Sequence, residues 1–240
     1  AATLNALAGG GTLVSFPALL ATGTDAVTAN ITSSVGLISG YAGGSVAYRR
    51  ELSGQRTRVR ALGVASVLGG IAGALLLLVT PVASFRAVVP YLILLACLLL
   101  AAQNRLAAWV ATRRATRPPA HIEITLGVQV GVFLSAIYGS YFGAGLGVML
   151  LGVLGTLLDD DLQRLNALKG VLSLVINAVG VVVFVSSARV AWVYAAVLAV
   201  SAYVGGTAGV AVARRLPVSV LRACVVALGV SVSVVLLVTS

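Results

Sequence analysis

The chain has 240 residues, of which 60 % are hydrophobic and only 9 % are charged, and its mean hydropathy is +1.09. A water-soluble domain cannot bury that much apolar surface, so the composition excludes an ordinary soluble protein and predicts a membrane protein. The net charge of +10 comes almost entirely from arginines that gather in short clusters between apolar runs, with few aromatic residues among them. That distribution is typical of cytoplasmic loops, and we do not expect nucleic-acid binding.

Apolar segments follow one another along the chain, separated by short polar stretches. Crossing about 30 Å of hydrocarbon as a helix takes about 20 apolar residues. The segments run approximately over Leu4–Thr22, Ala26–Tyr48, Ala61–Thr80, Ala87–Val110, Ile122–Leu158, Leu165–Val185, Val190–Ala211 and Val218–Val238. They predict an all-α, polytopic helix bundle that passes several times through the cell membrane.

The fifth segment, Ile122–Leu158, is too long for one ordinary membrane helix. Its middle, Tyr138–Gly147, holds four glycines and three aromatic residues. Glycine tolerates the backbone conformations that interrupt a helix. We therefore expect a break or hairpin at membrane depth, flanked by two short half-helices.

The second half of the sequence matches the first at one constant offset, without a gap. Asn30 meets Asn166, Pro81 meets Pro217, and Arg86 meets Arg222; the glycines at 9, 11 and 44 meet those at 145, 147 and 180. Apolar residues match by chance, but matched Asn, Pro and Arg rarely do. The pattern predicts a duplicated unit, with an N-terminal repeat over residues 1–117, including a cytoplasmic linker, and a C-terminal repeat over residues 118–240.

The charge pattern predicts that the two repeats are inserted upside down relative to one another. Arginines cluster at residues 49–60 and 105–117, which we expect to be cytoplasmic loops, whereas the match of the first cluster, residues 186–189, is nearly uncharged. Inversion requires an odd number of net membrane crossings in each repeat, and a broken or re-entrant first element followed by three transmembrane helices satisfies this. Because Ile122 aligns before Ala1, we also expect the first arm of the N-terminal repeat to be truncated.

Glycine-rich stretches at matching places in the two repeats are candidate anion sites. A half-helix that begins at a glycine break turns its free N–H groups and positive dipole end towards the cavity. Close helix packing explains such glycines equally well. The candidate residues are Gly9, Gly10, Gly11, Thr12, Gly143, Ala144 and Gly145.

Lys169, the single lysine of the chain, lies just inside an apolar run. A cation in the bilayer usually faces a cavity or a partner, so Lys169 is a candidate counter-charge for a bound anion. The alternative is a lysine near a helix start that extends to the headgroups.

Amide and hydroxyl side chains follow at the starts of the next helices. Asn30 and Asn166, with Ser33 and Asn177 further along, could replace the water removed from a bound anion. They could equally cap helices or join helices by hydrogen bonds.

The sequence offers no cluster for catalysis, metal binding or a cofactor. The two cysteines and the single histidine have no partners at ligand spacing, and no acidic residue lies deep in an apolar run. Asp25 and the run at residues 159–161 are expected to be solvated turns that cap helices. Arg86 and Arg222 are expected to be interfacial anchors.

Several of these stretches resemble the sulfite exporter TauE/SafE family. They are Gly9–Leu13 with Pro17, Thr28–Asn30, Tyr48–Leu52, Gly139–Gly145 and Asp161–Lys169. The resemblance covers essentially the whole chain. It implies a secondary transporter of sulfur-containing anions such as sulfite, sulfoacetate or related organosulfonates.

We therefore expect transport of a small anion by alternating access, with no enzymatic activity. The expected partners are the lipid bilayer, the anion and a coupling proton or ion, and the chain could also form a homo-oligomer. A passive anion channel on the same scaffold is the first alternative, and a non-transport accessory protein is the second. The sequence does not separate channel from carrier.

Overall fold

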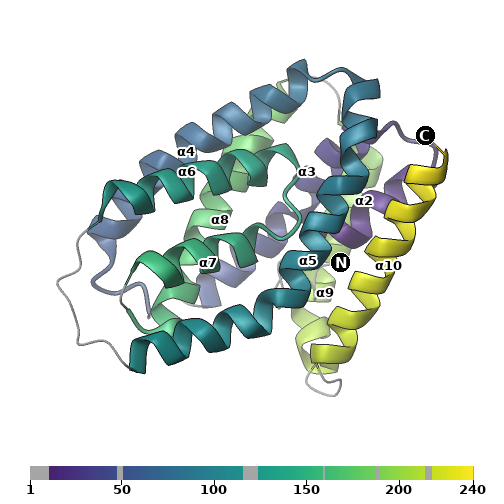
Figure 1. The fold of residues 1–240 in the computed structure, drawn as a ribbon. Coiled ribbons are helices and arrows are strands. Elements are labelled where there is room, and N and C mark those ends of the chain that lie inside the picture. The colour runs from purple at the N-terminus through teal and green to yellow at the C-terminus, as the bar shows by residue number, and fades with distance from the viewer. Residues whose placement is uncertain are drawn as a thin grey trace.

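The computed structural model describes residues 11–47, 51–115, 124–158, 160–186, 190–213 and 218–239, and within these ranges all regular structure is helical. The all-α bundle expected from the apolar segments is confirmed for this part of the chain. Gly9 and Gly10 lie outside the described residues. The helices, labelled as in Figure 1, are α2 (Thr12–Ala21), α3 (Ala26–Ala47), α4 (Arg56–Val79), α5 (Val82–Ala115), α6 (Leu126–Tyr141), α7 (Leu146–Leu157), α8 (Leu162–Val185), α9 (Trp192–Ala213) and α10 (Val218–Thr239).

Among the described residues, three stretches are long and apolar enough to cross a bilayer: Arg56–Val79, Val82–Val110 and Leu162–Val185. The surface of α4 shows why lipid must surround them. Its outer face carries Val64, Leu68, Leu75 and Val79, all at least half exposed. Its inner face is fully buried but made largely of small residues. An apolar outer surface over a small-residue contact face is the pattern of a membrane helix rather than of a soluble one.

Helix α4 lies along α6, as Figure 1 shows, and glycines set the distance between them. A Cβ atom added to Gly73 would lie 2.2 Å from the carbonyl oxygen of Ile137, and one added to Gly69 would lie 2.4 Å from that of Phe133. No side chain fits at either place. In lipid, where apolar association gains little from water exclusion, this close backbone approach is a principal source of helix–helix contact.

The long apolar segment Ile122–Leu158 forms a helical hairpin. Helix α6 ends at Tyr141 and α7 begins at Leu146, and between them Gly143 and Gly145 have φ of 83° and 79°. The two helices lie side by side in Figure 1, and a Cβ on Gly131 would meet Val153 at 2.6 Å. At about 1.5 Å per residue they are about 24 and 18 Å long, so neither spans the bilayer alone. The expected break is confirmed, and its left-handed glycines are its physical cause.

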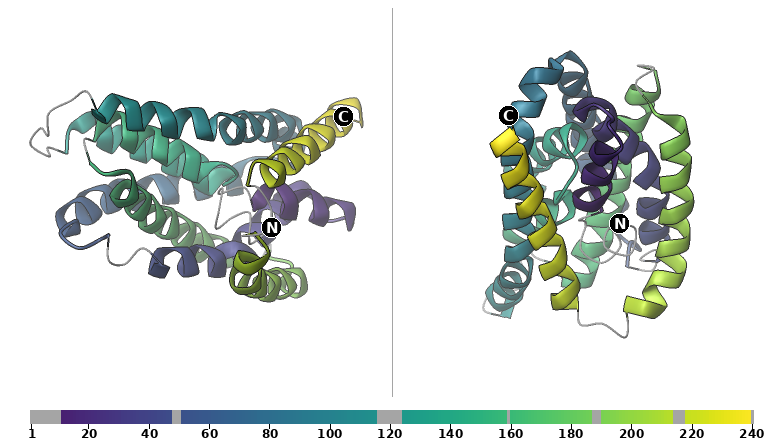
Figure 2. Two further views of the ribbon diagram at one scale, coloured as in Figure 1. Left: turned by 90° about the horizontal axis from the view of Figure 1, so that it is seen from below. Right: turned by 90° about the vertical axis from the view of Figure 1, so that its right-hand side faces the viewer.

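Helices recur along the chain with one spacing. Helices α3, α4 and α5 begin at residues 26, 56 and 82, and α8, α9 and α10 begin at residues 162, 192 and 218, so each pair is separated by the offset that relates Asn30 to Asn166. The contacts follow the same relation. Helix α3 contacts α9, and its counterpart α8 contacts α4, which is the counterpart of α9. Helix α3 also packs on its own counterpart α8, and α5 packs on its counterpart α10. Figure 2 shows the α5–α10 pair along one edge. The inverted membrane orientation of the two repeats stays a prediction.

The arginine clusters lie mostly in helices rather than in the expected loops. Arg56 is the first residue of α4, and α5 continues past Val110 to Ala115. Arginine is a good helix former, and its long side chain can reach water from a helix end. The prediction of loops over residues 49–60 and 105–117 was wrong for these parts of the clusters.

We predict that Gly73→Ala lowers stability by about 1–3 kcal/mol, because its methyl group must push α4 away from the Ile137 carbonyl. Thermal unfolding in detergent measures the change. Gly63→Ala is the matched control on the same helix, since nothing lies within 4 Å of its added Cβ. It should leave the midpoint unchanged or raise it, because alanine is the better helix former. Equal effects of the two variants would contradict close α4–α6 packing.

Candidate functional site

The start of α2 meets the break between α6 and α7. Thr12, the first residue of α2, is buried, and its Oγ1 would lie 3.7 Å from a Cβ on Gly143. Gly11, Gly143, Ala144 and Gly145 are buried as well. The structure therefore brings Thr12 of the first glycine-rich stretch beside Gly143 of the second, whereas Gly145 lies against Ala96 and Leu99 of α5. Figure 1 shows the α6–α7 connection turning towards α2 and α3.

Asn30 of α3 links α3 to the same break. We call the place where the start of α2, α3 and this break meet the crossing. Its side chain is fully buried, and its Nδ2 donates a hydrogen bond of 2.8 Å to the backbone carbonyl of Tyr141, the last residue of α6. Its Oδ1 is buried without a hydrogen-bond partner among the described residues. Leaving a buried acceptor unpaired costs about 1–3 kcal/mol, so this oxygen marks a place for a group that can donate.

Ser33 also lies at the crossing. It lies three residues after Asn30 on one face of α3, and its hydroxyl forms a short hydrogen bond with that of Ser15 on α2. Both serines are buried, and the Ser15 hydroxyl also donates to the carbonyl of Gly11. The hydroxyls hold α2 against α3 beside the unpaired Asn30 oxygen.

Aromatic side chains close the crossing on its other sides. Tyr138 donates a hydrogen bond of 2.6 Å to the carbonyl of Ala144, which bridges the two ends of the break. Phe16 and Phe142 pack edge to face with centroids 5.7 Å apart, and both are buried. The sequence analysis did not single out Ser15, Phe16 or Tyr138 as site residues. The aromatic residues beside the glycines were the one signal that could have found Tyr138.

A polar stripe runs along α8. Asn166, Lys169, Ser173 and Asn177 follow at intervals of three or four residues and so share one face. Lys169 Nζ donates to Asn166 Oδ1 at 3.0 Å, and Asn177 Nδ2 donates to the carbonyl of Ser173 at 2.8 Å. In the part of the chain that the structure describes, none of these side chains hydrogen-bonds to the α6–α7 break. Lys169 is half-buried rather than extended into solvent.

Aspartates cap the helices that follow them, as expected. Asp161 accepts a hydrogen bond of 2.9 Å from the backbone N–H of Gln163 at the start of α8, and Asp25 accepts one of 3.0 Å from that of Thr28 at the start of α3. The two aspartates occupy corresponding positions in the repeats. Asp160 differs from this prediction because it is not simply a solvated turn residue.

Asp160 forms a buried ion pair with Arg58 of α4, whose side chain is 5 % exposed. Arg164 adds a second contact, with its Nε 3.1 Å from Asp160 Oδ1. Burial would raise the pKa of Asp160, but the hydrogen bond from the Asp161 N–H and the two arginines outweigh it and hold that pKa below its usual value. Gln55, just before α4, donates at 3.0 Å to the carbonyl of Arg164. The cluster fastens α4 to the start of α8.

An open basic cavity of about 770 Å³ lies beside this ion pair. Its lining residues are Leu52, Ser53, Gly54, Arg56, Val59, Arg60 and Val171. Arg56 and Arg60 are exposed. Two guanidinium groups and a serine give this mouth a positive potential that attracts small anions.

The helices, the α6–α7 hairpin and the buried polar crossing define a helical membrane protein with an interrupted helix. The sequence profile of one family, Sulfite exporter TauE/SafE, matches residues 1–236. The chain belongs to this family. It is also 26 % identical, over 209 residues, to a protein of Haemophilus influenzae named "Probable membrane transporter protein"; the match covers 87 % of this chain and 79 % of that protein. No solved structure matches the chain.

These names indicate membrane transport rather than enzymatic activity. In the described residues no group of three or more His, Cys, Asp or Glu could hold a metal ion. The chemistry available at the crossing is therefore that of hydroxyls, amides and helix ends.

We predict that Asp160→Asn destabilises the protein by about 3 kcal/mol, because it leaves the Arg58 charge buried without its partner. Asp161→Asn is the control, since asparagine caps a helix as well as aspartate does. Unfolding in detergent at a series of pH values measures both variants.

The pH dependence has a defined sign. A carboxyl whose pKa is lowered by folding contributes stability at pH values above its ordinary pKa, near ~4, and loses that contribution as the pH falls through the folded pKa. The difference between wild type and Asp160→Asn should therefore shrink below about pH 4. A difference that stays constant into strong acid would contradict the ion pair.

Proposed function

We propose that this chain is a secondary transporter that moves a small sulfur oxyanion or organosulfonate, such as sulfite, across the cell membrane. The start of α2 lies beside the break that precedes α7, where the Thr12 hydroxyl approaches Gly143, and this observation carries the proposal. The dipole of each helix places about half a positive charge at its N-terminus, together with N–H groups that lack intrahelical partners. Such an end beside a helix break is a favourable place for an anion.

The polar groups at the crossing fit an oxyanion that carries a proton. Backbone N–H groups serve its charged oxygens, and the unpaired Oδ1 of Asn30 accepts a hydrogen bond from its hydroxyl. The hydroxyl of Ser33, paired to that of Ser15, can still accept a hydrogen bond from the ligand. A protonated substrate would carry its own coupling proton, which suits a chain with no acidic residue deep in its apolar segments.

Lys169 and Asn166 supply the matching half of the site in this proposal. Asn166 corresponds to Asn30 in the repeat, and Lys169 corresponds to Ser33. Asn30 binds the break of the C-terminal repeat. We propose that Asn166 plays the part of Asn30 in the other repeat, with Lys169 as the counter-charge and Asn177 further along the same stripe.

Alternating access would open a route to the crossing, which is closed to solvent in this structure. Asn30 and Ser33 are fully buried, whereas the basic cavity at Arg56 and Arg60 is open. Movement of one inverted repeat against the other would expose the crossing first to one face of the membrane and then to the other. The α2–α3 pair and the α6–α7 hairpin are the elements that must separate.

We predict that Lys169→Gln and Asn30→Ala each lower the rate of sulfite or sulfonate uptake into proteoliposomes roughly tenfold or more, because each removes a hydrogen bond to a charged ligand. Ser34→Ala is the matched control on α3, since its hydroxyl donates to the carbonyl of Asn30 within its own helix. It should change uptake less than about twofold. Unfolding midpoints confirm that each variant is folded, and undiminished transport by both site variants would remove these residues from the mechanism.

The same vesicles separate a carrier from the passive channel. A carrier accumulates the labelled anion above its external concentration when an inward proton gradient is imposed, and collapse of the gradient abolishes that accumulation. A channel only equilibrates the anion. Absence of any protein-dependent flux for sulfite, sulfonates and small carboxylates would favour an accessory role.

A further inference from the structure

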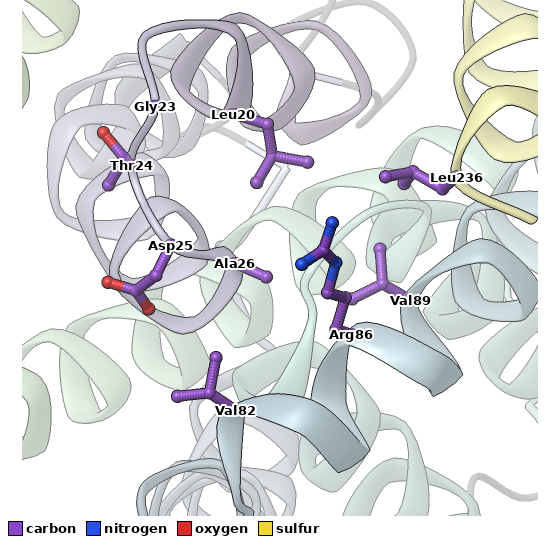
Figure 3. A pocket seen from close by; sticks show the side chains of 9 residues that line it. All are labelled: Leu20, Gly23, Thr24, Asp25, Ala26, Val82, Arg86, Val89 and Leu236. Carbon is purple, nitrogen blue, oxygen red and sulfur yellow. The ribbon is translucent and has the colours of Figure 1, made fainter. Parts of the chain in front are cut away.

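A second cavity lies away from the crossing, at the opposite end of α4 from Arg56. It has a volume of about 330 Å³, and Figure 3 shows its lining: Leu20, Gly23, Thr24, Asp25, Ala26, Val82, Arg86, Val89 and Leu236. These residues come from the α2–α3 turn, the first turns of α5 and the end of α10. We call this cavity the Arg86 pocket.

Arg86 supplies the charge of this pocket. Its guanidinium points into the cavity in Figure 3, between Leu20 and Leu236. In the described part of the chain it forms no ion pair or hydrogen bond. Asp25 also lines the pocket, but its carboxylate caps Thr28 and points away from the guanidinium. The pocket therefore presents a planar set of donors that suits a carboxylate, sulfonate or phosphate.

The walls beside Arg86 are apolar. Leu20, Val89 and Leu236 lie around the guanidinium, and Val82 lies one turn before Arg86 on the same helix. The outer faces of α5 and α10 continue the apolar surface, with Val88, Tyr91, Val235 and Val238 exposed. An apolar stem on a ligand held by Arg86 would cover this apolar surface, whereas a bare inorganic ion would leave it uncovered.

We propose that the Arg86 pocket binds the oxyanion head of an amphiphilic ligand, a sulfonate or phosphate on an apolar stem, separately from the crossing. The guanidinium holds two oxygens of the head, and the stem lies against Leu20, Val89 and Leu236. A free organosulfonate and a membrane phospholipid share this chemistry. The site requires no transport cycle, so loss of the proposed transport function would leave it standing.

Binding to the purified full chain in a nonionic detergent tests the site. Calorimetric titration with 1-butanesulfonate and with inorganic sulfate compares wild type with Arg86→Gln. Arg105→Gln is the matched control, because Arg105 is an exposed arginine further along the same helix. Native mass spectrometry measures the binding of phosphatidylglycerol to the same three proteins.

We expect Arg86→Gln to weaken binding of one butanesulfonate or one phosphatidylglycerol roughly tenfold or more, and Arg105→Gln to leave it unchanged. Loss of the sulfonate identifies a free solute as the occupant, and loss of the lipid alone identifies a phospholipid. Equal weakening by both variants reveals only general attraction to positive charge and overturns the proposal. An unchanged affinity in Arg86→Gln for both ligands also overturns it.

A second variant tests the pocket without removing the charge. Val82→Phe fills the cavity from a position that is 43 % exposed, so the fold has room for the ring. It should weaken butanesulfonate more than inorganic sulfate, because only the former uses the apolar wall. Equal effects on both ligands would show that the stem does not enter the cavity.

Discussion

A helix interrupted inside a bilayer leaves backbone N–H and C=O groups that lipid cannot satisfy, and this constraint governs the arrangement around residues 141–146. The side-chain amide of Asn30 donates a hydrogen bond to the carbonyl of Tyr141, and the hydroxyl of Tyr138 donates one to the carbonyl of Ala144. Glycines at 143 and 145 provide the left-handed turns between them. The interruption is therefore stabilised partly from within the hairpin and partly by Asn30 of α3, from the other end of the chain. The pairing leaves the break beside the start of α2, where Thr12 approaches Gly143.

Elements that follow from local chemistry could be predicted from the sequence. Apolar length identified the helices, glycine composition identified the break, and the aspartates at 25 and 161 cap the helices as expected. Contacts between distant segments could not be predicted in this way. Nothing local distinguishes Asp160 from its neighbours, and its pairing with Arg58 depends on α4 lying beside α8. Ser15 was missed for the same reason, since its partner Ser33 is on another helix. The roles of Asn30, Asn166 and Lys169 remain predictions, although the structure gives each of them a defined partner.

The two halves carry different chemistry at corresponding positions. Ser33 and Lys169 are equivalent in the repeat, yet one is neutral and paired to Ser15, and the other is cationic and paired to Asn166. A duplicated scaffold with one charged and one uncharged copy would bind an anion asymmetrically.

The ion pair of Arg58 and Asp160 joins α4 to the α7–α8 connection at one end of the bundle, and the Gln55 hydrogen bond reinforces it there. Helix α4 also meets α6 through Gly69 and Gly73, which bring the two backbones close but carry no charge. Rocking of the two repeats would therefore have its fulcrum near Asp160 and its widest excursion at the far end, around Pro81 and the α2–α3 turn. In the proposed movement, a small rotation about this polar anchor would become a larger opening at the opposite end of the bundle.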